Sequence, residues 1–119
     1  MNQRINFQNK LELCSEHWSP KVIAEMNDYQ FKLAKIKGKL TWHDHADNDE
    51  TFIVLEGSMG TALKDWTLQL SEEEICVVAH GQAHKSFADD CRVLLVEPKG
   101  VVNTCETGGE SIAQNDVWV

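Results

Sequence analysis

Short apolar runs separated by turn residues dominate the pattern along most of this chain. The runs are rich in β-branched and aromatic residues, as in the TFIVL run at 51–55, and Gly, Asn or Asp stands between many of them. A spacing of roughly 8–12 residues between such runs is typical of an all-β sandwich or barrel. The predicted strands cover residues 22–24, 29–36, 40–45, 51–55, 59–63, 66–70, 75–78, 84–87 and 92–96.

The two ends of the chain differ from this middle part. Residues 1–20 mix polar and apolar positions with little periodicity, and a short helical turn or strand is predicted near 11–14. A single barrel is predicted over 21–103, with a turn or bulge at 37–39. A polar tail follows over 104–119. No helical pattern alternates with the strands, which disfavours a parallel α/β sheet.

Composition and charge narrow the class of protein. The chain has 119 residues, which fits one domain. An apolar share of 42% and a charged share of 25% are ordinary for a globular protein and argue against global disorder. The net charge is 11 − 19 = −8, whereas a nucleic-acid groove needs a basic patch. We therefore expect no nucleic-acid partner and no adhesion to anionic membranes.

The sequence also predicts a cytoplasmic location. The first ten residues are polar and lack the apolar core of a signal peptide. No run approaches the ~20 apolar residues of a membrane span. The four cysteines form no C-x-x-C pair, and we expect them to be reduced thiols: Cys14, Cys76, Cys91 and Cys105.

Three histidines and a glutamate carry the candidate chemistry. His43 and His45 lie two apart on a predicted strand, so their side chains share a face and their Cα atoms are ~6.7 Å apart. Asp44 points to the other face. Glu50 opens the next predicted strand, and His84 begins a later one. Imidazoles with one carboxylate suit Fe, Mn, Zn, Ni or Cu as a single divalent ion. Four protein ligands would leave about two open positions on a six-coordinate ion, as a catalytic metal requires.

The same residues carry a resemblance to a known family. His43-x-His45, four residues, Glu50, six residues and Gly57 resemble the first motif of the cupins. The stretch from Gly81 to His84 resembles their second motif, although Ala79 stands where that motif has proline. The likeness to small single-domain bacterial cupins of the cupin-2 type covers roughly residues 18–105.

This resemblance implies a fold, a ligand set and an assembly. Cupins of this type are jelly-roll β-barrels with a metal held inside by three His and one Glu. Residue by residue, the ligands correspond to His43, His45, Glu50 and His84. The cupins are also usually homodimers, so a homodimer is expected, with residues 1–20 as the element that two subunits would exchange.

Three functions are consistent with such a site. The first is a metal-dependent enzyme acting on a small polar metabolite, of the dioxygenase, isomerase or lyase type. The second is a non-catalytic module that binds a ligand or senses metal, and the third is a structural subunit. A sugar-phosphate substrate is disfavoured because phosphate sites need clustered basic groups, and the only arginines are Arg4 and Arg92. No catalytic residue beyond the metal ligands can be assigned.

Residues near the motifs have plainer interpretations. Trp42 and Phe52 are expected to pack in the core, with lining of a substrate pocket as the alternative. His17 and His80 are expected at the surface, with a role beside the metal or substrate as the alternative for His80. The acidic run at 72–74 is expected to form a solvated turn.

Overall fold

The described part of the chain folds into one short helix and seven strands. The computed structural model describes residues 3–40, 42–45, 47–101 and 116–119. None of the helices in these ranges is long and apolar enough to cross a membrane. The elements are α1 (Phe7–Leu11), β1 (Lys21–Met26), β2 (Tyr29–Lys39), β3 (Glu50–Gly57), β4 (Met59–Ala62), β5 (Thr67–Leu70), β6 (Ile75–Val78) and β7 (Lys85–Pro98).

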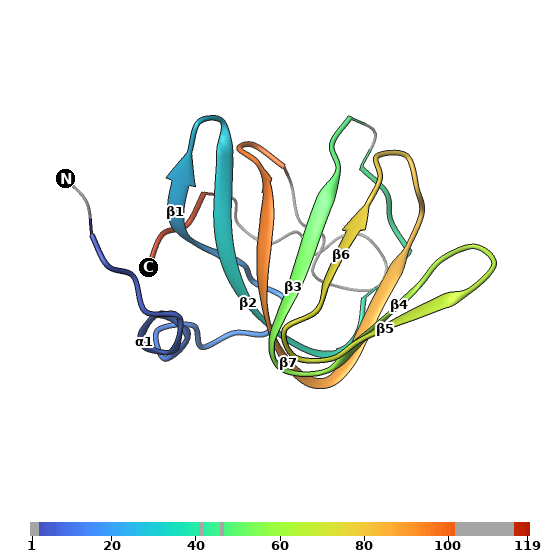
Figure 1. The fold of residues 1–119 in the computed structure, drawn as a ribbon, viewed down its shortest axis with the longest axis horizontal. Coiled ribbons are helices and arrows are strands. Elements are labelled where there is room, and N and C mark those ends of the chain that lie inside the picture. Colours follow the sequence, from blue (N-terminus) through green and yellow to red (C-terminus); the bar gives the residue numbers. More distant parts are fainter. Residues whose placement is uncertain (1–2, 41, 46, 102–115) are drawn as a thin grey trace.

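The strands form an antiparallel sheet that curls into an open barrel (Figure 1). The main strand order is β1-β2-β7-β3-β6, and the β4–β5 hairpin joins it through β4, which pairs with β7. Non-consecutive neighbours such as β2 and β7 bring together residues that are far apart in sequence. The predicted all-β barrel with a short helical turn is therefore confirmed.

Strand β7 organises the barrel because it pairs with three other strands. Its first residues pair with β4 and the end of β2, and its later residues pair with β2 and β3. Gly57 has a positive φ of 81° where the chain passes β7, and a Cβ there would lie 2.4 Å from the Asp90 carbonyl oxygen. Only glycine permits this close approach, which explains its place in the motif.

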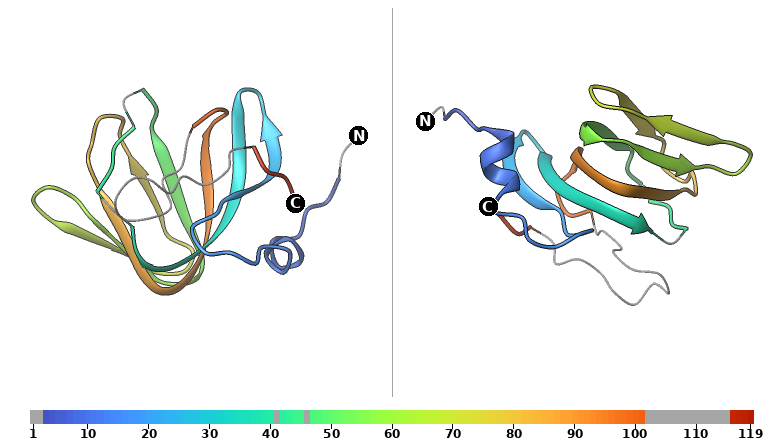
Figure 2. Two further views of the ribbon diagram at one scale, coloured as in Figure 1. Left: turned by 180° about the vertical axis from the view of Figure 1, so that it is seen from behind. Right: turned by 90° about the horizontal axis from the view of Figure 1, so that it is seen from below.

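The central strands have apolar residues on both faces. The inner cluster contains Ala34, Ile36, Phe52, Val54, Met59, Leu70, Val78, Cys91, Val93 and Leu95. The outer cluster contains Leu11, Cys14, Ile23, Leu33 and Leu94. Helix α1, which begins after the N-cap Asn6, lies against the outside of β1 and β2 (Figure 2). The N-terminal segment thus covers part of the outer face.

Two strand predictions are wrong in detail. Residues 40–45 were expected to form a strand, but β2 ends at Lys39 and only an isolated bridge joins His43 to His84. The Leu40 backbone N–H donates to the Ser86 carbonyl oxygen, and the next backbone pairing joins His43 to His84. Between these two pairings this segment advances three residues, whereas the opposite segment advances two. The unequal spacing interrupts the regular pattern of hydrogen bonds between strands. The strands expected at 84–87 and 92–96 are one continuous strand, β7. The predicted irregularity at 37–39 is confirmed as a shift of register at Gly38, where φ is 88°.

The described end of the C-terminal tail lies beside strand β1. Val22 accepts a backbone hydrogen bond from Val119 and donates one to Val117. Most of the tail predicted over 104–119 lies outside the described residues. Exchange of residues 1–20 between two subunits stays a prediction.

Candidate metal centre

His43 and His84 face each other across the isolated bridge. Each backbone N–H donates to the other residue's carbonyl oxygen, at 3.0 and 2.9 Å. Their imidazole centroids are 4.2 Å apart. The two histidines are 41 positions apart in sequence, and it is the meeting of the segment after β2 with the start of β7 that joins them.

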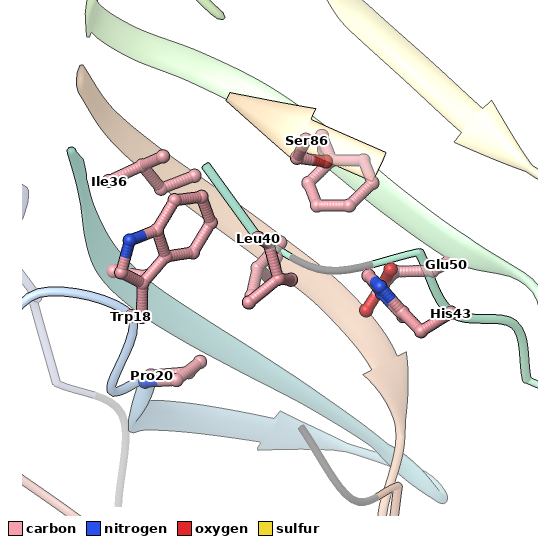
Figure 3. Close-up of a pocket in the computed structure, with 10 residues that line it drawn as sticks. Trp18, Pro20, Ile36, Leu40, His43, Glu50 and Ser86 are labelled. Atoms are coloured by element: carbon pink, nitrogen blue, oxygen red, sulfur yellow. The ribbon is translucent and has the colours of Figure 1, made fainter. Parts of the chain in front are cut away.

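Glu50 enters the same space from β3. It is the first residue of that strand and pairs with Val78 of β6, which places its side chain inside the barrel. Phe52 and Val54 are buried on the same face, so β3 alternates regularly and Glu50 lies on its inner side. Figure 3 shows the side chains of His43 and Glu50 directed toward each other.

His43, Glu50 and His84 form a compact group of metal-ligating side chains. One ligand atom from each lies within 4.8 Å of the others, and Glu50 Oε1 is 3.4 Å from His84 Nε2. Two imidazoles and a carboxylate at this separation could hold a metal ion. The three residues come from different parts of the barrel wall, so the sheet fixes their separation.

His45 lies at the edge of this group. Its Nε2 atom is 3.5 Å from Glu50 Oε2, and its ring centroid is 5.4 Å from that of His43. The argument that placed both histidines on one strand face was wrong, because this segment is not a strand. A hydrogen bond from the Gly81 backbone N–H to the His45 carbonyl oxygen, at 2.7 Å, links the two loops instead.

The polar atoms facing one another here fit a cation. Among the described residues, His45 Nε2, Glu50 Oε1 and His84 Nε2 are buried without a hydrogen bond of good geometry. The other ring nitrogen of His84, Nδ1, is 3.0 Å from the Gln82 carbonyl oxygen, to which it can only donate. In neutral His84 this leaves a lone pair on Nε2, directed at the group. Buried lone pairs without donors are what a metal ion would satisfy.

The pKa values favour an anionic carboxylate. Burial alone would raise the pKa of Glu50, but its interactions with His45 and His84 outweigh burial and hold that pKa below its usual range. The same interaction with Glu50 raises the pKa of His45, against the opposing effect of burial. Glu50 therefore supplies negative charge that a cation would neutralise.

A second pair of charged side chains lies deeper in the barrel. Lys32 Nζ is 2.8 Å from Glu97 Oε1, and these side chains are 2% and 0% exposed. Burial and the charge of Glu50 raise the pKa of Glu97 to about 7. Neither residue was singled out as a site residue from the sequence, although β2 and β7 direct both side chains inward.

A mainly apolar cavity adjoins the group. Seven of its ten lining residues are apolar, and its polar ones are His43, Glu50 and Ser86. The sequence did not identify Trp18 as a lining residue, because it comes from the segment before the barrel. Phe52 is buried in the core, as predicted, and it also lines this cavity.

The remaining candidate residues lie away from the cavity. Trp42 was expected in the core but is 48% exposed, with Lys85 Nζ 5.6 Å from its ring centroid. His80 is exposed as expected, and its ring and backbone nitrogens contact Asp49 at 2.8 and 2.9 Å. His17 is exposed too.

The fold and the group of ligands define a small β-barrel protein with a candidate metal centre inside. A cupin-2 domain protein from Shewanella frigidimarina is 49% identical, with 80% of this chain and 94% of that chain covered and a TM-score of 0.78. Protein NMB1881 from Neisseria meningitidis is 28% identical over 82% of this chain and 100% of that chain, with a TM-score of 0.74.

One curated relative also matches, whereas no family model does. The uncharacterized protein YdbB of Bacillus subtilis is 38% identical over 65 residues, which are 54% of this chain and 58% of that protein. The match thus spans little more than half of YdbB. On the strength of the Shewanella protein, this chain belongs to the cupin-2 domain proteins, as its motifs predicted.

Proposed function

We propose that this cupin holds one divalent transition-metal ion through His43, His45, Glu50 and His84. The observation that carries the proposal is the close approach of His43, Glu50 and His84, whose ligand atoms lie within 4.8 Å of one another. It is supported by the buried atoms His45 Nε2, Glu50 Oε1 and His84 Nε2, which have no hydrogen-bond partner among the described residues. His43, Glu50 and His84 form the compact part, and His45 would complete the set from the opposite side of Glu50. The donor types suit Fe, Mn, Zn, Ni or Cu.

The first functional candidate is a metal-dependent enzyme of the dioxygenase, isomerase or lyase type. When bound, the ion would polarise an oxygen of a small metabolite or bind O2 at its open positions. The chain's own residues prepare the site in two ways. The Gln82 carbonyl orients His84, and the apolar wall that includes Phe52 and Leu95 keeps water away.

The second candidate is a module that binds a ligand without changing it. It is favoured by the scarcity of acid–base groups at the cavity, where the polar side chains among the described residues are His43, Glu50 and Ser86. His80 has the right chemistry, but it is exposed and contacts Asp49. Incubation of metal-loaded protein with candidate metabolites, followed by mass spectrometry, separates the two, because only an enzyme returns altered molecules.

The metal centre is tested by elemental analysis of untagged protein purified without chelators. We expect close to one equivalent of a transition metal. The His43→Ala variant should lose it, since that change removes a ligand from the compact group. His80→Ala is the matched control, because His80 is exposed and outside the proposed set, and it should retain the metal. Metal-free protein that takes up no added ion would contradict the proposal.

We also propose that the protein is a homodimer. Ile75 and Val77 of β6 are 59% and 60% exposed, and β6 pairs only with β3 among the described strands. An apolar edge strand of this kind is normally covered by a partner. Light scattering should give twice the chain mass, and Val77→Lys should shift it toward the monomer. The cytoplasmic location stays a prediction.

A further inference from the structure

The cavity beside the metal centre has two chemically different ends. Figure 3 shows Trp18, Pro20 and Ile36 at one end and His43 and Glu50 at the other. The apolar residues belong to three separate parts of the chain: the N-terminal segment, β2 with the residue after it, and the β3–β7 pair. A molecule that entered would therefore meet polar groups at one end only.

The apolar end is held in place by hydrogen bonds of its own. The Trp18 indole N–H donates to the Lys37 carbonyl oxygen at 2.7 Å, and its backbone N–H donates to the Lys35 carbonyl oxygen at 2.8 Å. Its φ of 58° is a conformation that a tryptophan seldom adopts. Pro20, two residues later, is buried. These contacts fix the indole as a preformed wall.

The cavity offers little to a highly polar ligand. Among the described residues that line it there is no lysine or arginine, so a phosphate group would find no positive side chain. Beyond the proposed metal ligands, Ser86 is the one polar residue among the described lining residues, and its hydroxyl lies 3.4 Å from Thr61 Oγ1. Each hydroxyl of a sugar left unpaired here would weaken binding by about tenfold.

We propose that the ligand of this centre is a small molecule with its oxygen donors at one end and a short apolar group at the other. The oxygen atoms would face His43 and Glu50, and the apolar group would lie against Trp18, Ile36 and Leu95. The cavity volume of about 40 Å³ limits that group to a few carbon atoms. This inference rests on the proposed metal centre for the polar end, and on the cavity alone for the apolar end.

The apolar end can be tested without any metal. Xenon is a single apolar atom that enters dry apolar cavities. In metal-free protein with labelled methyl groups, NMR should show xenon-dependent shifts at Ile36, Leu40 and Leu95. The exposed methyls of Leu13 and Met26 serve as internal controls, because these residues do not line the cavity. Equal shifts at both sets of methyls, or none at the cavity, would overturn the inference.

The orientation of the ligand is tested with probes that share one metal-binding group, a 2-oxo acid, and differ at their other end. In calorimetry on zinc-loaded protein, 2-oxobutanoate should bind about tenfold more tightly than 3-hydroxypyruvate, which carries a hydroxyl in place of its methyl. Binding should also strengthen about fourfold from pyruvate to 2-oxobutanoate, as one CH2 group is added. Tighter binding of 3-hydroxypyruvate, or displacement of 2-oxobutanoate by ribose 5-phosphate, would refute the ligand class.

Substitution of the wall provides a further check. Trp18→Ala should weaken 2-oxobutanoate about fourfold and leave pyruvate nearly unchanged, whereas Trp18→Phe should restore part of the difference. An equal loss for both acids would count against the proposed orientation. Failure of the proposed metal centre and failure of the proposed ligand class give different results. Xenon shifts without metal uptake would refute the metal centre alone, whereas metal uptake with a preference for hydroxylated probes would refute the ligand class alone.

Discussion

The inner and outer faces of the sheet formed by β2, β7 and β3 are made of alternating residues of the same strands, but they bury different chemistry. The inner face combines an apolar cluster with buried Lys32, Glu50 and Glu97. The outer face, where the N-terminal segment covers it, buries apolar side chains such as Leu33 and Leu94. Two surfaces of one sheet thus serve two purposes.

The difference between the two faces indicates that the inner face is not optimised for folding stability. Burying a charged pair is often no better for stability than packing apolar residues of the same volume. A chain of this size has a net stability of only about 5–15 kcal/mol, so inward-facing charges are a substantial liability. Their retention on the inner face fits a role in binding. Among the described residues, the buried side chains of Lys32, Glu50 and Glu97 all lie on the inner face, so the outer face is left with a role in packing.

The largest stability effect should follow from breaking the inner charged pair. Lys32→Met leaves Glu97 buried without its cation, and at about pH 9, where the Glu97 carboxyl of the wild type is ionised, we expect a loss of about 3–5 kcal/mol in the free energy of unfolding. Urea denaturation measures this loss. The double variant Lys32→Met with Glu97→Leu should recover most of it, since no unpaired charge remains. If the single variant proved as stable as the wild type, the pair would not be buried as described.

A smaller loss is expected from the outer face. Leu11→Ala removes a buried side chain that packs on Ile23 and Leu33, and we expect about 2 kcal/mol of destabilisation. Metal affinity should be unchanged, because α1 lies on the opposite side of the sheet from the ligands. Denaturation and metal titration of the same variant test both statements. A changed metal affinity would show that the two faces are coupled.

The mildest test compares two buried thiols. Cys91 lies in the inner cluster, where burial raises its pKa to about 11, so about one molecule in a thousand is a thiolate at pH 8. Burial raises the pKa of Cys14 as well, but this residue belongs to the N-terminal segment, residues 1–20. End segments open more readily than central strands. Alkylation followed by mass spectrometry should therefore label Cys14 before Cys91, and the reverse order would contradict this account.

The inward position of Glu50 was predictable because β3 alternates regularly, whereas β2 shows why such reasoning has limits. In β2, Phe31 and Leu33 suggest an apolar inner face on which Lys32 has no place. The structure has the opposite phase, since α1 covers the outer face and makes it apolar too. A charged residue can then point inward without any sign in the local pattern.

The remaining surprises depend on contacts that are distant in sequence. Between the Leu40–Ser86 and His43–His84 pairings, the two segments advance by different numbers of residues. The rule that residues two apart on a strand share a face therefore did not apply to His43 and His45. Trp18 reaches the cavity only because the segment before the barrel runs beside β2, where His17 bridges to Lys35. Neither arrangement leaves a periodic signal, because each depends on how separate segments pack.

Because the indole of Trp18 lines the cavity, a fragment of this protein that lacked Trp18 would have an incomplete ligand site. A fragment that began at Lys21 would keep every strand and all four proposed metal ligands, yet one wall of the cavity would be missing. If the first 20 residues were exchanged between subunits, that wall would come from the second chain. Mixed dimers of a Trp18 variant and a ligand variant would then regain one complete site from two defective chains.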